Sequence, residues 1–171
     1  VEAFFNERTL AIGLRVEGAD PDKDLASATL RLFDVDGDRV PSASDGPGAA
    51  ETELTLTFED VAWEGDRFAA AASGGLPVGW EGVHSVRVRV LDARGLQSEG
   101  LEVDVAPTPE WVAGQPCDSA GGLTACPNGG MCDPVTAECG EAVAECPDDW
   151  EVIDLADHQH EGSRFVYRGD T

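Results

Sequence analysis

The residues with the most distinctive chemistry are five cysteines, which all lie between positions 117 and 146. Cysteines clustered in a short, loop-rich segment are typical of disulfide bonds that form in an oxidising compartment. A zinc site is the rival interpretation, but four thiolate ligands usually occur as two Cys-x2-Cys pairs. Here eight, five, six and six residues separate successive cysteines, which favours disulfides. Three pairings are open among the first four cysteines, which are Cys117, Cys126, Cys132 and Cys139.

The fifth cysteine, Cys146, has no partner within this set. An odd cysteine can be a free thiol, bond another chain, or bond a cysteine elsewhere in a longer polypeptide. Because Cys146 opens the next predicted domain, we expect its partner to lie outside this sequence.

Alternating aspartates in two loops form the second candidate site. Ca²⁺ binds six to eight oxygens, and alternate aspartates on a tight loop can converge on one ion. The segment 34–38 is similar to the start of EF-hand and thrombospondin type 3 calcium loops, although Arg39 stands where an EF-hand has Gly. The alternative is a solvated hairpin turn with Asp-Gly at its tip. Calcium is therefore the candidate cofactor, and its candidate ligands are Asp20, Asp22, Asp24, Asp34, Asp36 and Asp38.

The common catalytic and phosphate-binding motifs are absent from the sequence. It contains no Gly-x-Ser-x-Gly elbow, phosphate-binding loop, His-Glu-x-x-His or Gly-x-Gly-x-x-Gly. The acidic pairs that could serve a glycosidase lie in turns beside Gly and Pro. We therefore expect a protein that is not an enzyme.

The charge of the chain excludes several classes of partner. Eleven Lys+Arg against 34 Asp+Glu give a net charge of −23, which opposes binding to nucleic acid and to anionic membrane surfaces. No apolar run reaches the about 18 residues of a transmembrane helix, so we expect no membrane insertion. Ten Arg against one Lys, with few Ile and Asn, fit a GC-rich prokaryotic genome.

Apolar and polar residues alternate in several short segments of the first 106 residues, and this pattern is typical of half-buried antiparallel strands. Turn-forming residues separate the segments, and no amphipathic helix is predicted. About seven short strands favour an all-β fold, a β-sandwich. The expected strands are 1–5, 9–16, 29–33, 52–58, 66–72, 85–91 and 101–105.

Two segments of this region resemble bacterial immunoglobulin-like domains, and similar patterns occur in cadherin-like and fibronectin type III modules. They are Gly18–Leu25, before a strand, and Val88–Glu99, before the last strand. The resemblance implies an immunoglobulin-like β-sandwich over residues 1–106. The antibody-type Cys–Trp–Cys signature is absent, because no cysteine precedes Cys117.

Three further segments follow the predicted sandwich. Residues 107–114 are expected to be a stiff linker because of Pro107 and Pro109, and residues 115–146 form a cysteine-rich module. Residues 147–171 are expected to form two strands, 150–155 and 163–167, at the start of a further domain. This last segment resembles the opening of the pre-peptidase C-terminal β-sandwich of secreted bacterial proteins.

The cysteine-rich module carries a more specific resemblance. Its segment Cys126-Pro-Asn-Gly-Gly-Met-Cys132 resembles the central motif of EGF-like modules, in which Asn-Gly supplies a turn with positive φ. The EGF-like pattern implies disulfides between Cys117 and Cys132 and between Cys126 and Cys139. Position 141 is Glu where an EGF-like module has another cysteine, so the chain is at best a truncated relative.

These features together predict a non-enzymatic extracellular or cell-surface module of a prokaryote, acting as a stalk, adhesin unit or fibre subunit that calcium stiffens. The expected partners are other protein domains or subunits of the same assembly. A homopolymer would form if the strand Phe165–Tyr167 added to the sheet of an adjacent subunit. The alternative is a set of non-catalytic accessory domains of a secreted hydrolase, which the pre-peptidase resemblance suggests.

Overall fold

The chain forms two compact units, Val1–Gly140 and Glu141–Thr171. The structure is a computed structural model that describes residues 1–40, 53–59, 61–76, 83–140, 150–154 and 164–168, the last two segments by their backbone. Within these residues every regular element is a strand, apart from one 3-10 turn, so the predicted all-β class is confirmed. No helix in the described part of the chain is long and apolar enough to cross a membrane.

The strands of the first unit form where apolar and polar residues alternate. In β2, for example, Leu14 and Val16 are buried whereas Arg15 and Glu17 are exposed. The bounds in chain order are β1 Glu2–Asn6, β2 Ala11–Ala19, β3 Leu25–Phe33, β4 Leu54–Thr57, β5 Val61–Glu64, β6 Arg67–Gly75, β7 Ser85–Asp92 and β8 Leu101–Pro107. All seven strands expected from the sequence are present. Strand β5 was not expected, because its four residues show little alternation and it is held by pairing with β6.

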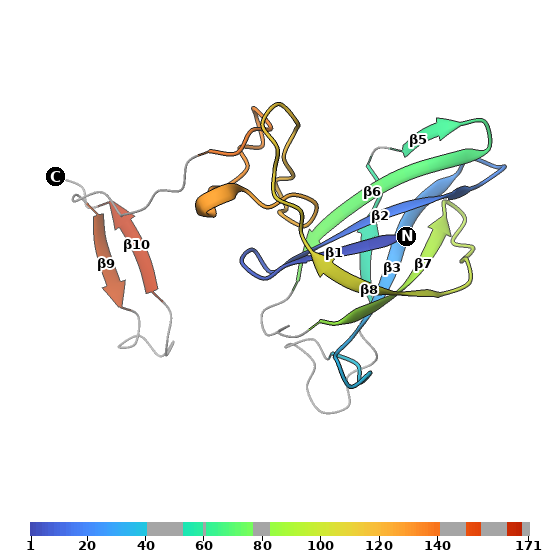
Figure 1. The fold of residues 1–171 in the computed structure, drawn as a ribbon, viewed down its shortest axis with the longest axis horizontal. Helices are drawn as coiled ribbons and strands as arrows, with labels where there is room; N and C mark the ends of the chain where they lie inside the picture. Colours follow the sequence, from blue (N-terminus) through green and yellow to red (C-terminus); the bar gives the residue numbers. More distant parts are fainter. Residues whose placement is uncertain (41–52, 60, 77–82, 141–149, 155–163, 169–171) are drawn as a thin grey trace. The chain divides into compact units, whose positions relative to one another are not determined.

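The eight strands are joined in one curled sheet of order β4-β3-β7-β8-β1-β2-β6-β5 (Figure 1). The sequence predicted about seven strands in two separate sheets that face each other, but β1 pairs with β8 and joins the strands into one sheet. This pairing is parallel, with Ala3 opposite Val105, Phe4 opposite Ala106 and Phe5 opposite Pro107. The other pairings in the sheet are antiparallel. The immunoglobulin-like arrangement of these strands stays a prediction.

The hydrophobic core lies inside the curl, where both halves of the sheet contribute side chains. Burying apolar area at about 25 cal/mol per Å² is the main favourable term in folding. The largest fully buried side chains come from β2, β3 and β7, and they are Ile12, Leu14, Leu30 and Val86. The core thus holds together strands that are far apart in sequence.

The predicted linker is bonded to its surroundings at several points. Strand β8 includes Pro107, and the N–H of Thr108 donates to the carbonyl of Phe5 at 3.2 Å. Further on, the N–H of Trp111 donates to the carbonyl of Ala125 at 3.0 Å. As a result the first unit extends to Gly140, whereas the sequence placed domain boundaries at 106 and 114.

The second unit contains a two-stranded antiparallel hairpin of β9, Trp150–Asp154, and β10, Arg164–Arg168. Both strands fall within one residue of their expected positions. Residue Val166 is opposite Val152, at the centre of the register.

The position of the core gives the first prediction. Leu14 is 0% exposed, so Leu14→Ala should lower the free energy of unfolding by about 2–5 kcal/mol, through lost burial and a cavity. Leu96 is 65% exposed, and Leu96→Ala should change it by less than about 0.5 kcal/mol. Urea denaturation measures both values. Equal effects of the two substitutions would contradict the core described here.

Candidate functional site

The structure joins Cys117 to Cys132 and Cys126 to Cys139, with Cα atoms 5.8 and 5.5 Å apart. This is the pairing that the EGF-like pattern implies. The sulfur atoms of Cys117, Cys126 and Cys139 lie within 4.8 Å of one another, so the two bridges are neighbours. All four sulfurs are in S–S bonds and none is a thiolate, the form in which cysteine binds zinc. Cys146 lies outside the described residues.

The disulfides hold a segment that has few apolar side chains of its own to bury. Its chain direction changes in tight turns, one of them at Asn128 and Gly129, which have φ of +52° and +82° as the Asn-Gly pair predicted. Backbone hydrogen bonds close the segment on itself, such as that from the N–H of Cys117 to the carbonyl of Ala137 at 2.9 Å. A disulfide that closes a loop of about 15 residues contributes about 3 kcal/mol in the chain-entropy model.

The disulfide segment, residues 115–140, packs on the outer face of the sheet at a site where two backbones touch. A Cβ added at Gly13 would overlap the carbonyl of Gly122, and a Cβ added at Gly122 would overlap the carbonyl of Ile12. Only glycine at both positions permits this approach. The contact also explains why Ala11–Leu14 are all buried in β2, since the segment covers the face that would otherwise be exposed to water.

Asp118 links the segment to the sheet. One carboxylate oxygen accepts hydrogen bonds from the Ser73 hydroxyl of β6 at 3.0 Å and from the N–H of Ala120 at 3.0 Å. The other oxygen accepts from the N–H groups of Gly122 and Leu123 at 2.8 and 2.9 Å. Because Ser73 is opposite Gly13 in the register, this network lies beside the glycine contact and aligns the loop with it.

Two further hydrogen bonds attach the same loop to β1 and to the residue that follows β8. The buried side-chain amide of Asn6 donates to the carbonyl of Gly121 at 2.8 Å, and the hydroxyl of Thr108 donates to the carbonyl of Gly122 at 2.9 Å. The loop is therefore bonded to β1, to the residue after β8 and to β6.

The sequence-based interpretation missed Asp118, Gly13 and Gly122. A glycine inside an otherwise apolar strand is a signal of close backbone approach, and Gly13 carries that signal. Asp118 precedes a Gly-Gly pair by three residues, in a position typical of an aspartate that caps a turn. Neither signal predicts which residue will be in contact. For Gly13 that residue is Gly122, more than 100 positions later in the sequence.

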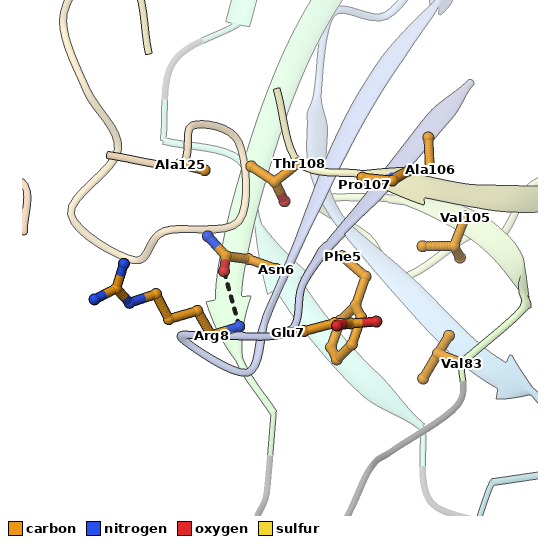
Figure 2. Close-up of a pocket in the computed structure, with 10 residues that line it drawn as sticks. All are labelled: Phe5, Asn6, Glu7, Arg8, Val83, Val105, Ala106, Pro107, Thr108 and Ala125. Carbon is orange, nitrogen blue, oxygen red and sulfur yellow. Dashed lines mark hydrogen bonds between the residues drawn. The ribbon is translucent and has the colours of Figure 1, made fainter. Parts of the chain in front are cut away.

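A cleft of about 420 Å³ lies where β1, the end of β8 and the disulfide segment meet (Figure 2). Phe5, Val83 and Val105 give it an apolar lining, and the turn after β1 adds Glu7 and Arg8, whose side chains point in opposite directions. The polar atoms of Asn6 are engaged, because its carboxamide oxygen accepts from the N–H groups of Arg8 and Thr9 at 3.1 and 3.2 Å. The polar atoms of Asn6 therefore hold the turn, and we assign the cleft no reaction.

The first aspartate cluster is bonded to an arginine. The Arg94 guanidinium contacts the carboxylates of Asp22 at 2.6 Å, Asp24 at 3.2 Å and Asp92 at 3.3 Å. Asp20 instead accepts hydrogen bonds from the N–H groups of Asp22 and Asp24, both at 3.1 Å. The Arg94 guanidinium therefore offsets part of the negative charge of Asp22, Asp24 and Asp92.

The second cluster forms a turn around Asp34. One oxygen of its carboxylate accepts from the N–H groups of Asp36 and Asp38 at 3.0 and 2.9 Å, and Gly37 has a φ of +79°. A turn with Asp-Gly at its tip was the alternative to a calcium loop in the sequence analysis. In the described part of the chain no three carboxylates bring an oxygen each within 4.8 Å of one another. Calcium binding stays a prediction at both clusters.

Hydrogen bonds change the acidity of two aspartates. Burial acts to raise the pKa of Asp92, but the N–H groups of Leu96 and Arg94 and the Arg94 guanidinium outweigh it and lower the pKa. The Arg94 guanidinium in turn has a raised pKa, chiefly through its hydrogen bond to Asp22. In the disulfide segment, the N–H of Val135 lowers the pKa of Asp133.

The glycine contact gives the second prediction. Gly13→Ala should force the disulfide segment away from β2, because backbone atoms occupy the place of the new methyl group. We expect a loss of at least about 2 kcal/mol of unfolding free energy. Gly75→Ala is the matched control, since that strand glycine has open space around it and no positive φ. Thermal unfolding of both variants measures the difference, and equal stability would rule out the contact.

The lowered pKa of Asp92 gives the third prediction. A carboxyl whose folded pKa lies below its unfolded value of about 3.9 stabilises the protein above about pH 4, and this contribution is lost as the pH falls through the folded pKa. Asp92→Asn removes the ionisation, so unfolding free energy should decline less steeply from pH 4 to pH 2 in the variant than in the wild type. Urea denaturation across this range measures both slopes. Identical slopes would show that Asp92 has no such role.

No protein-family model, curated protein or solved structure matches the chain.

Proposed function

We propose that this chain is a non-catalytic structural unit of a prokaryotic extracellular or cell-surface assembly, and that it serves as a stalk, adhesin unit or fibre subunit. A unit of this kind must transmit force along the polypeptide without unfolding. The observation that carries the proposal is the parallel pairing of β1 with β8. These are the first strand of the sheet and the last, and the chain leaves the sheet at the end of β8.

The parallel pairing of β1 with β8 determines the direction in which tension acts on the hydrogen bonds between them. The chain enters at the start of β1 and leaves at the end of β8, and in parallel strands these two points lie at opposite ends of the ladder. Tension between them acts along the strands and loads the hydrogen bonds of residues 3–5 and 105–107 in shear. Bonds loaded in shear must break together, whereas bonds loaded across an antiparallel hairpin open one after another.

The disulfide segment continues the same load path. Tension that passes through residues 117–139 meets two covalent bridges, one across a separation of 15 residues and one across 13. Its loop is also bonded to the strands, through Asn6, Ser73 and Thr108. Because of the bridges and these hydrogen bonds, we expect the segment not to extend under tension before the sheet unfolds.

The disulfide bonds and the charge of the chain support the same proposal. Disulfide bonds persist in oxidising compartments, outside the cytoplasm. A net charge of −23 keeps surfaces apart from one another and opposes aggregation of a protein with exposed strand edges.

Single-molecule force spectroscopy tests this proposal and is the fourth prediction. We expect a several-fold higher unfolding force when the full chain is pulled at residues 1 and 171 than when it is pulled at residues 1 and 17. The second geometry opens the β1–β2 hairpin from its free end, because Glu2 is opposite Arg15 and the turn follows Asn6. Both measurements therefore begin at β1 and differ only in the direction of load.

Reduction supplies the control for the disulfide segment. Cleaving the bridges should lengthen the fully unfolded chain by about 45 Å, because the sequence separation of 15 from Cys117 to Cys132 then extends at about 3.4 Å per residue instead of the 5.8 Å that the bridge spans. Unfolding forces that do not depend on the direction of load would overturn the mechanical role.

A further inference from the structure

The four bridged cysteines bring their sulfur atoms into one compact group, the cysteine cluster. The sulfurs of Cys117, Cys126 and Cys139 lie within 4.8 Å of one another, although the first belongs to one bridge and the other two to the second. The fourth sulfur, that of Cys132, is bonded to Cys117 and so belongs to the same group. Among the described residues, no other three cysteine, histidine, aspartate or glutamate side chains converge in this way.

Backbone contacts hold three of these positions together independently of the bridges. Cys132 lies opposite Cys139 in an antiparallel β-bridge. The N–H of Cys117 donates to the carbonyl of Ala137, two residues before Cys139, at 2.9 Å. The fold thus gathers cysteines that the sequence separates by five, six and eight residues, without the Cys-x2-Cys pairs that usually mark a zinc site.

The fourth position, Cys126, is held by other backbone contacts. Ala125, the residue before it, donates its N–H to the carbonyl of Pro109 at 2.8 Å and accepts at its own carbonyl from the N–H of Trp111 at 3.0 Å. The hydrogen bonds of Asp118 attach the loop between the cysteines to the sheet. None of these contacts involves a sulfur atom, so they remain available when the bridges are reduced.

Reduction turns the cysteine cluster into a set of four thiol ligands. Each bridge takes up two electrons and two protons, and its two sulfurs become thiols. Zn²⁺ displaces the thiol protons and takes four sulfurs in a tetrahedron at about 2.3 Å, so that the sulfurs lie about 3.8 Å apart. Three sulfurs of the cluster already lie within 4.8 Å of one another. The bonded sulfurs must separate, and rotation about the Cα–Cβ bond moves a cysteine sulfur without moving the backbone.

The charge around the cluster bears on such a site. Four thiolates and one Zn²⁺ carry a net charge of about −2, which an acidic chain disfavours. The guanidinium of Arg8 occupies the place that a side chain at Gly129 would take, in the turn that follows Cys126, and it offsets part of this charge. Two carboxylates beside cysteines, those of Asp118 and Asp133, accept hydrogen bonds from backbone N–H groups, which compensate part of their own charge.

We propose that the reduced form of this chain binds one Zn²⁺ through the thiolates of Cys117, Cys126, Cys132 and Cys139. In a reducing compartment these cysteines are thiols, and bound zinc holds them together before the bridges form. A small-molecule disulfide then oxidises the site. Each bridge forms as two thiolates pass two electrons to one oxidant molecule, which leaves as two thiolates, and Zn²⁺ is released. The inference goes beyond the proposed function, which concerns the oxidised chain.

Metal titration of the full chain, reduced with a phosphine under nitrogen, tests the inference and is the fifth prediction. Zn²⁺ should bind one to one with a Kd below about 0.1 µM, the weak end of the range for structural zinc sites, in competition with a chromophoric chelator. Co²⁺ as a probe should give the visible bands of a tetrahedral site and the charge-transfer absorption of thiolates. The oxidised chain should give neither signal, which separates the site from the many surface carboxylates.

Three variants and an unfolded sample make the result specific. Cys126→Ser and Cys132→Ser each remove one ligand and should weaken Zn²⁺ binding at least tenfold. Cys146→Ser is the matched control, because it removes a thiol outside the cluster, and it should bind like the wild type. Reduced chain unfolded in urea should also bind at least tenfold more weakly, because the backbone contacts no longer hold the cysteines together. Circular dichroism checks that the sheet is folded in each variant.

A reduced chain without thiolate absorption, or with a Kd above about 0.1 µM, would overturn the inference. So would equal weakening by Cys146→Ser and Cys132→Ser, because a thiol outside the cluster would then hold the metal. Unchanged affinity in urea would show that the fold does not build the site. The force measurement starts from the oxidised chain, so failure of either proposal leaves the test of the other intact.

Discussion

The backbone contact between Gly13 and Gly122 is the constraint on which the first unit depends. The disulfide segment has little apolar surface of its own. Its two bridges connect residues within the segment and do not attach it to the sheet. The glycine contact brings its loop within reach of Asn6, Thr108 and Ser73, whose hydrogen bonds would otherwise go to water. A methyl group at either glycine would separate all of these partners at once.

This docking has a consequence for function. A cysteine-rich segment on a free linker would move independently and would extend early under load. Hydrogen-bonded to β1, to β6 and to the residue after β8, and in contact with β2 at Gly13, the segment is held to the sheet on which the proposed load acts. This arrangement supports the mechanical role that we propose for the chain.

Local patterns in the sequence predicted the strands but not their connection. Alternation located β2, β3, β4, β7 and β8, because each strand has one face in the core. The β1–β8 pairing joins residues about 100 positions apart, and no local pattern specifies such a partner, so two sheets were expected where one curled sheet exists.

The disulfide pairing was predicted from the EGF-like resemblance, since the spacing of the cysteines alone left three pairings open. Aspartate spacing predicted calcium ligands at Asp22 and Asp24, but no local pattern could predict that Arg94 contacts both carboxylates.

Nuclear magnetic resonance tests the docking most directly. In the oxidised full-length protein, the α protons of Gly13 should show nuclear Overhauser effects to the protons of Gly122 and Leu123, which the structure places in contact with them. The amides of the sheet and of residues 117–139 should also report one rotational correlation time. Absence of these cross-peaks, together with faster tumbling of residues 117–139, would show a tethered module and would contradict this account.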